Sequence, residues 1–147
     1  NGTNWTAVND MNRANEGPAG AGTSTSALAF GGASIPDSTI ANTELWNGTN
    51  WTNVNNLGTG RIQLAGAGAT NTAALAFGGN KPPPSSGITE TWNGTNWTET
   101  GDLNTARRSL AGAGTQTTAL AFGGQSPVTA ATEEWNDGPQ VRTIDTD

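Results

Sequence analysis

The sequence has 147 residues, a formal net charge of −6, and no histidine, cysteine or tyrosine. These absences exclude disulfides and thiolate metal sites and remove the commonest general base, while the acidic charge argues against a nucleic-acid partner. We therefore expect no enzymatic activity and no cofactor or metal, and no apolar run reaches the about 20 residues that span a bilayer.

The sequence repeats the same blocks three times in the same order. The string Asn-Gly-Thr-Asn-Trp-Thr begins at Asn1, Asn47 and Asn93, Ala-Gly-Ala-Gly occupies 19–22, 65–68 and 111–114, and Leu-Ala-Phe-Gly-Gly ends at Gly32, Gly79 and Gly124. This pattern predicts a single repeat domain over residues 1–147, with repeats at 1–46, 47–92 and 93–135. Residues 136–147 are expected to form a C-terminal tail or cap strand.

Each unit predicts four short strands, which follow one another in chain order. Residues 19–23 are small enough for a crowded inner strand, and residues 27–30 form an apolar strand that ends in Gly-Gly. Residues 42–46 predict the third strand, with copies at 88–92 and 131–135, and residues 49–54 predict the fourth. The Asn-Gly pair at 47–48 between them predicts a type I′ hairpin turn.

Four strands in a unit of this length are typical of a propeller blade, and the repeat resembles the kelch repeat. The resemblance lies in a Gly-Gly pair followed by spaced tryptophans: Gly31, Gly32, Trp46 and Trp51; Gly78, Gly79, Trp92 and Trp97; Gly123, Gly124 and Trp135. Arg61 and Arg107 match an arginine common before the first kelch strand, where the first repeat has Asn15. The resemblance implies an all-β, kelch-like β-propeller with three four-stranded blades per chain, in which these residues and Trp5 are structural.

Three blades are too few for a closed ring, which usually has about four to eight. We therefore expect a half-ring or part of a larger propeller, whose open edge and apolar faces favour association. Residues 4–8 could complete the blade begun by residues 103–135, with the tail segment 141–144 as a rival for that edge. In a dimer, residues 4–8 of each chain would close a blade of the other and complete a six-bladed ring; further blades of a longer chain are the alternative partner.

Two sets of residues could carry chemistry or could serve the fold. Glu44, Glu90 and Glu133 each lie two residues before a tryptophan, and we interpret them as partners of Arg61 or Arg107. The alternative is a ring of carboxylates that binds a cation or a polar ligand. The tryptophans are interpreted as packing between blades, with sugar-stacking platforms as the alternative.

Two further features lie in turns and loops. The Asn-x-Thr sequons at Asn1, Asn4, Asn47, Asn50, Asn93 and Asn96 are interpreted as turn chemistry rather than glycosylation sites. The loops after Gly-Gly differ most between repeats, so they are either candidate partner-binding loops or unconstrained connectors. Their candidate residues are Pro36, Asp37, Lys81, Pro83, Ser85, Gln125 and Pro127.

These observations predict a non-catalytic structural or binding module. The wording of the repeats is similar to that in phage virion-associated and bacterial extracellular proteins, which implies a virion or extracellular location and a protein or glycan partner on a host surface. A carbohydrate-binding propeller is the second hypothesis. A hydrolase or lyase is the third, and it would need acidic residues that meet in one cleft with a raised pKa.

Overall fold

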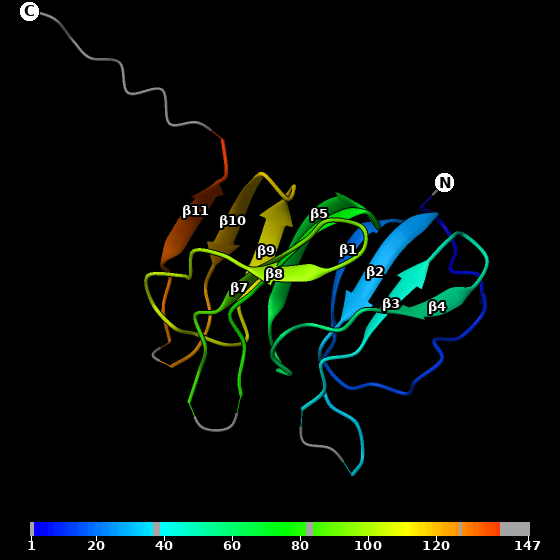
Figure 1. Cartoon of the computed structure of the whole chain (residues 1–147), viewed down its shortest axis with the longest axis horizontal. Coiled ribbons are helices and arrows are strands. Elements are labelled where there is room, and N and C mark those ends of the chain that lie inside the picture. The colour runs from blue at the N-terminus through cyan, green and yellow to red at the C-terminus, as the bar shows by residue number, and fades with distance from the viewer. Residues whose placement is uncertain (1, 37–38, 82–83, 127, 139–147) are drawn as a thin grey trace, which may run out of the picture.

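The computed structural model describes residues 2–36, 39–81, 84–126 and 128–138 (Figure 1), and this part of the chain contains strands and no helix. The strands are β1 Ala19–Thr23, β2 Ser26–Phe30, β3 Thr43–Trp46, β4 Trp51–Val54, β5 Ala65–Thr70, β6 Ala73–Phe77, β7 Thr89–Trp92, β8 Trp97–Glu99, β9 Ala111–Gly114, β10 Thr118–Phe122 and β11 Thr132–Asn136. The all-β prediction is confirmed. No described helix is long and apolar enough to cross a membrane.

The strands form three antiparallel sheets that are offset from the predicted repeats, because β4 lies in the repeat 47–92 but belongs to the first sheet, and β8 lies in the repeat 93–135 but belongs to the second. The first sheet has the order β1-β2-β3-β4, the second β5-β6-β7-β8, and the third β11-β10-β9. The predicted unit of four strands is therefore present in the first two sheets. The third sheet has three strands among the described residues, and β11 leaves its outer edge unpaired. The segment 141–144 lies outside the described residues.

The sheets pack side by side through their first strands and their apolar faces. In Figure 1, β1 lies against β5 and β5 against β9, so the three sheets follow one another in a row. Phe30 of the first sheet and Phe77 of the second are buried between neighbouring sheets. Each phenylalanine covers a glycine of the next sheet, Gly66 and Gly112 respectively.

The glycine under Phe30 should tolerate no side chain. A Cβ on Gly66 would lie 2.7 Å from Phe30 Cζ and 2.8 Å from the carbonyl oxygen of Gly20. We expect Gly66→Ala to lower the free energy of unfolding by about 1–3 kcal/mol, the usual effect of overpacking. Gly20→Ala is the matched control at a protein concentration low enough to keep the chain single, because its Cβ then meets only the Leu28 carbonyl oxygen at 3.4 Å. Urea denaturation measures the free energy of unfolding of both variants. Equal losses for Gly66→Ala and Gly20→Ala would contradict the packing of Phe30 on Gly66.

The turn prediction at Asn47 is wrong. The paired residues Trp46 and Trp51 enclose four loop residues, and of these only Gly48 has a positive φ, at 94°. A type I′ turn requires positive φ at both central residues. The Asn47 side chain explains the difference, because its Oδ1 accepts hydrogen bonds from the backbone N–H groups of Thr49 and Asn50, both at 2.9 Å. The asparagine therefore holds the loop together from its side chain rather than through a left-handed backbone.

Residues 4–8 form no strand in the single chain, so the expected closure of the third sheet within one chain is wrong. All five residues are exposed, and Trp5 is completely so. The reason is distance, since this segment lies beside the first sheet, at the opposite end of the array from β11 (Figure 1).

Candidate functional site

The acidic residues of the repeats are tied to structural donors. Arg61 is completely buried, and its Nη2 lies 2.9 Å from Glu90 Oε1. Arg61 Nη1 also donates to the carbonyl oxygens of Gly78 and Ile88. Glu90 Oε2 accepts a hydrogen bond from the Gly58 N–H at 2.7 Å. Burial lowers the pKa of Arg61 and so opposes its charged form, while Glu90 acts in the opposite direction.

The corresponding glutamates of the other two repeats, Glu133 and Glu44, also accept hydrogen bonds from nearby residues. Glu133 pairs with Arg107 at 2.9 Å and accepts hydrogen bonds from the N–H and the Nδ2 of Asn104. Glu44 accepts hydrogen bonds from the backbone N–H groups of Asn12 and Arg13. The ion pairs expected from Arg61 and Arg107 are thus present for Glu90 and Glu133, whereas Glu44 is held by these two backbone N–H groups and by Asn12 Nδ2 at 3.0 Å.

The three carboxylates do not form a common site. Each belongs to a different sheet and is engaged by its own donors. Across the described ranges, no group of three or more histidine, cysteine, aspartate or glutamate side chains is placed to hold a metal ion. The three carboxylates therefore each stabilise their own sheet through these hydrogen bonds and ion pairs.

The tryptophans divide by burial. Trp46 and Trp92 are buried, and their Nε1 atoms donate to the carbonyl oxygens of Ser24 and Asn71. Trp135 makes the same bond to Gln116 but is only half-buried. Packing explains Trp46 and Trp92, whereas Trp5 and Trp135 have aromatic surface left to cover.

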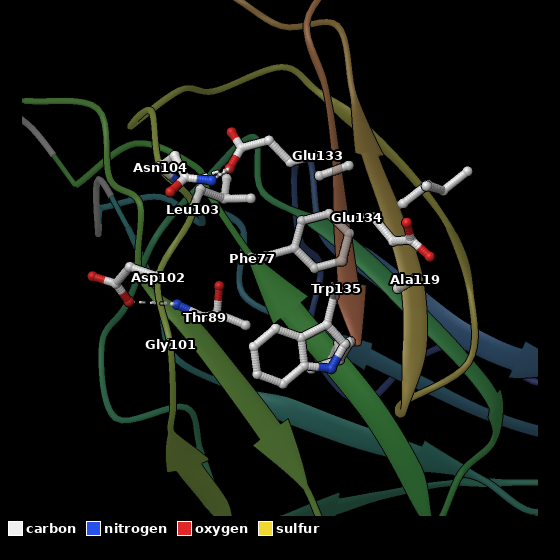
Figure 2. Close-up of a pocket in the computed structure, with 13 residues that line it drawn as sticks. Phe77, Thr89, Gly101, Asp102, Leu103, Asn104, Ala119, Glu133, Glu134 and Trp135 are labelled. Atoms are coloured by element: carbon white, nitrogen blue, oxygen red, sulfur yellow. Dashed lines mark hydrogen bonds between the residues drawn. The ribbon is translucent and has the colours of Figure 1, made fainter. Parts of the chain in front are cut away.

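A pocket lies beside Trp135, between the second and third sheets. Its empty space is about 410 Å³ when the adjoining open solvent is counted. Figure 2 shows Phe77, Thr89 and Trp135 directed toward this space, with Leu103 at its side. The Thr89 N–H donates to Asp102 Oδ1 at 3.1 Å, and the threonine hydroxyl donates to the Gly87 carbonyl oxygen at 3.5 Å and lies on the pocket side.

The same place between the first and second sheets is filled by Trp97. Its ring meets Phe30 edge-to-face with centroids 4.9 Å apart, and it lies 5.4 Å from the ring of Trp92. Its Nε1 donates to Thr43 Oγ1 at 3.0 Å. In the repeats, Phe30, Thr43 and Trp92 correspond to Phe77, Thr89 and Trp135. The pocket therefore has the three residues that, in the neighbouring pair of sheets, contact a tryptophan. We call this arrangement of phenylalanine, threonine and tryptophan side chains a tryptophan seat.

Sequence reasoning missed this seat, although a signal for it exists. Each repeat has a threonine at the start of its third strand, at Thr43, Thr89 and Thr132, and a phenylalanine before Gly-Gly. Only the packing of neighbouring sheets brings these residues together around a tryptophan from the fourth strand.

The loops after Gly-Gly project from one side of the array, which is the lower side in Figure 1. Among the candidate partner-binding residues, Pro36, Lys81 and Gln125 are exposed, and Ser85 is half-buried. Gln125 bridges to Arg108 through two backbone hydrogen bonds. Asp37, Pro83 and Pro127 lie outside the described residues.

Comparison with known proteins adds no relative. No protein-family model and no curated protein matches the sequence.

Proposed function

We propose that the chain is three blades of an incomplete kelch-like β-propeller and acts as a non-catalytic structural and binding module at a virion or cell surface. One observation carries the proposal. Leu120 and Phe122 of the third sheet are 43% and 39% exposed, whereas their counterparts Leu28 and Phe30 are buried by the next sheet. The array thus ends on a face of the kind that a further blade covers.

The state of the carboxylates supports a non-catalytic role. A catalytic acid needs access to a substrate. Glu90 is instead buried against Arg61, and Glu133 is held by Arg107 and Asn104. The variable loops on one side of a rigid array are where we place recognition of a protein or glycan on a host surface.

A carbohydrate-binding propeller is the second candidate, and the pocket beside Trp135 favours it. An indole wall next to polar groups is a common setting for sugar stacking. Under this alternative, Trp135→Ala would abolish binding on a glycan array, and the pocket would stay open to solvent. Under the main proposal, the pocket is closed by protein, and the wild-type chain gives no binding that depends on Trp135.

A tandem fusion of two copies of residues 1–147 tests the propeller directly. We expect the fusion to run as one compact particle of about twice 14.9 kDa, and to unfold in one transition at a higher temperature than the single chain. Light scattering after size exclusion and calorimetry measure both properties. The same fusion with Phe122→Asp in both copies is the control and should lose the added stability. A fusion that associates into larger particles, or melts like the single chain, would overturn the proposal.

A further inference from the structure

We infer that the pocket beside Trp135 receives Trp5 of a second copy of this chain, whose residues 4–8 add to β11 as the fourth strand of the third sheet. The inference rests on the proposed propeller and names its missing partner. Three independent features of the chain support it: the position of the segment before Asn9, the register of the existing sheets, and the match between the two ends of the array.

The residue that follows the segment 4–8, Asn9, already contacts the first sheet. Asn9 Nδ2 donates to the Thr49 carbonyl oxygen and to Asn50 Oδ1, both at 2.9 Å. One repeat later, Asn55 Nδ2 makes the same two bonds to Thr95 and Asn96, at 3.0 and 2.8 Å. The residues before Asn55 are strand β4, which belongs to the sheet that precedes the second one. The residues before Asn9 are therefore directed toward a sheet that precedes the first, and within the described chain no such sheet exists.

The register follows from the two complete sheets. Trp46 pairs with Trp51 across β3 and β4, and Trp92 pairs with Trp97 across β7 and β8. The same pairing places Trp5 of the second copy opposite Trp135, and Thr6 opposite Glu134. It also places Val8 opposite Thr132, where the first sheet pairs Val54 with Thr43.

The pocket then supplies every contact that Trp97 has. The Trp5 ring would lie against Phe77 and Trp135, and its Nε1 would donate to the Thr89 hydroxyl, as Trp97 does with Phe30, Trp92 and Thr43. Burial of a fully exposed indole with a partner for its N–H is favourable both for its apolar area and for its polar atom.

The joint between the third sheet of one copy and the first sheet of the other also matches. Phe30 and Phe77 cover Gly66 and Gly112, whereas the corresponding Gly20 of the first sheet has no phenylalanine near its Cβ position. Phe122 is the phenylalanine without a glycine beneath it. Seating Phe122 of one copy on Gly20 of the other repeats the packing inside the chain. Two such joints related by a twofold axis close six sheets, which is within the usual range of about four to eight blades.

Disulfide trapping tests the register in a protein that has no cysteine of its own. The variant Thr6→Cys/Glu134→Cys places the two cysteines in one cross-strand pair, about 4.5–5.5 Å apart between Cα atoms, which a disulfide can span. We expect mild oxidation to give a covalent two-chain species that reducing agent separates. The matched control Thr6→Cys/Thr132→Cys is off register by two residues, about 7–8 Å, and should trap poorly.

Trp5→Ala provides the second arm and cannot harm the fold of the single chain, because its side chain makes no buried contact there. We expect it to convert the two-chain particle to single chains, while Ile35→Ala, which removes an equally exposed side chain, leaves the mass unchanged. Wild-type protein that stays single-chain, equal trapping in both cysteine pairs, or an open ladder of multimers would overturn the inference. If the tandem fusion nevertheless closes, the propeller stands and only the second copy is wrong as its partner.

Discussion

Replacing Arg61 by methionine should destabilise the chain by about 3–5 kcal/mol, the usual effect of removing one partner of a buried ion pair. The substitution leaves Glu90 buried with the Gly58 N–H as its remaining donor, and it also removes the donors to the Gly78 and Ile88 carbonyl oxygens. Urea denaturation followed by tryptophan fluorescence measures the loss.

Arg107→Met is the matched comparison for Arg61→Met. Its partner Glu133 has a side chain that is 16% exposed and keeps both hydrogen bonds from Asn104. We expect a smaller loss of about 1–3 kcal/mol, because the remaining carboxylate is still hydrogen-bonded and partly hydrated. A loss below about 1 kcal/mol for Arg61→Met would place its pair among surface ion pairs and contradict the structural role of the carboxylates.

The second large effect is expected at Trp92, which is completely buried between the first and second sheets. Trp92→Ala removes the contact with Trp97 and the hydrogen bond to the Asn71 carbonyl oxygen. We expect a loss of about 3–5 kcal/mol in the free energy of unfolding, since a cavity remains where the indole was.

Comparison of Trp135→Ala with Trp92→Ala distinguishes the effect of burial from the effect of position in the strand, because the two tryptophans are equivalent in the repeat. Trp135 donates the corresponding bond to the Gln116 carbonyl oxygen at 3.0 Å, but its ring is half-buried beside the pocket. At the lowest protein concentration that gives a signal, Trp135→Ala should lower the free energy of unfolding by less than half as much as Trp92→Ala does. The loss should grow with protein concentration, because association covers the ring. If the loss for Trp135→Ala is the same at every protein concentration, nothing covers this tryptophan.

Much of the local structure was predictable from the sequence, because the same strand-forming segments recur at the same place in each repeat. Small residues at 65–68 and the apolar strand before Gly78 recur in each unit, and both lie in strands. The pairing of Arg61 with Glu90 also followed, because an alternating strand places a glutamate on the face of its tryptophan and an uncompensated buried charge needs a partner.

The rest depended on contacts that local patterns do not encode. The Asn47 loop differs from the predicted turn because a side chain of the loop itself supplies the hydrogen bonds. The tryptophan seat at Phe77 and Thr89 exists only where two sheets meet. Residues 4–8 carry the same strand signal as residues 50–54, yet they form no strand in the single chain, because the unpaired edge of β11 lies at the opposite end of the array.

The solution mass of the wild-type chain, measured by light scattering after size exclusion, is the most direct test of the central claim. We expect a particle of about twice 14.9 kDa that does not grow further as the concentration rises, because two three-sheet arrays close on each other. A particle of 14.9 kDa at every concentration would contradict this expectation, and would show that the pocket beside Trp135 does not bind Trp5 of a second copy and that Phe122 stays exposed.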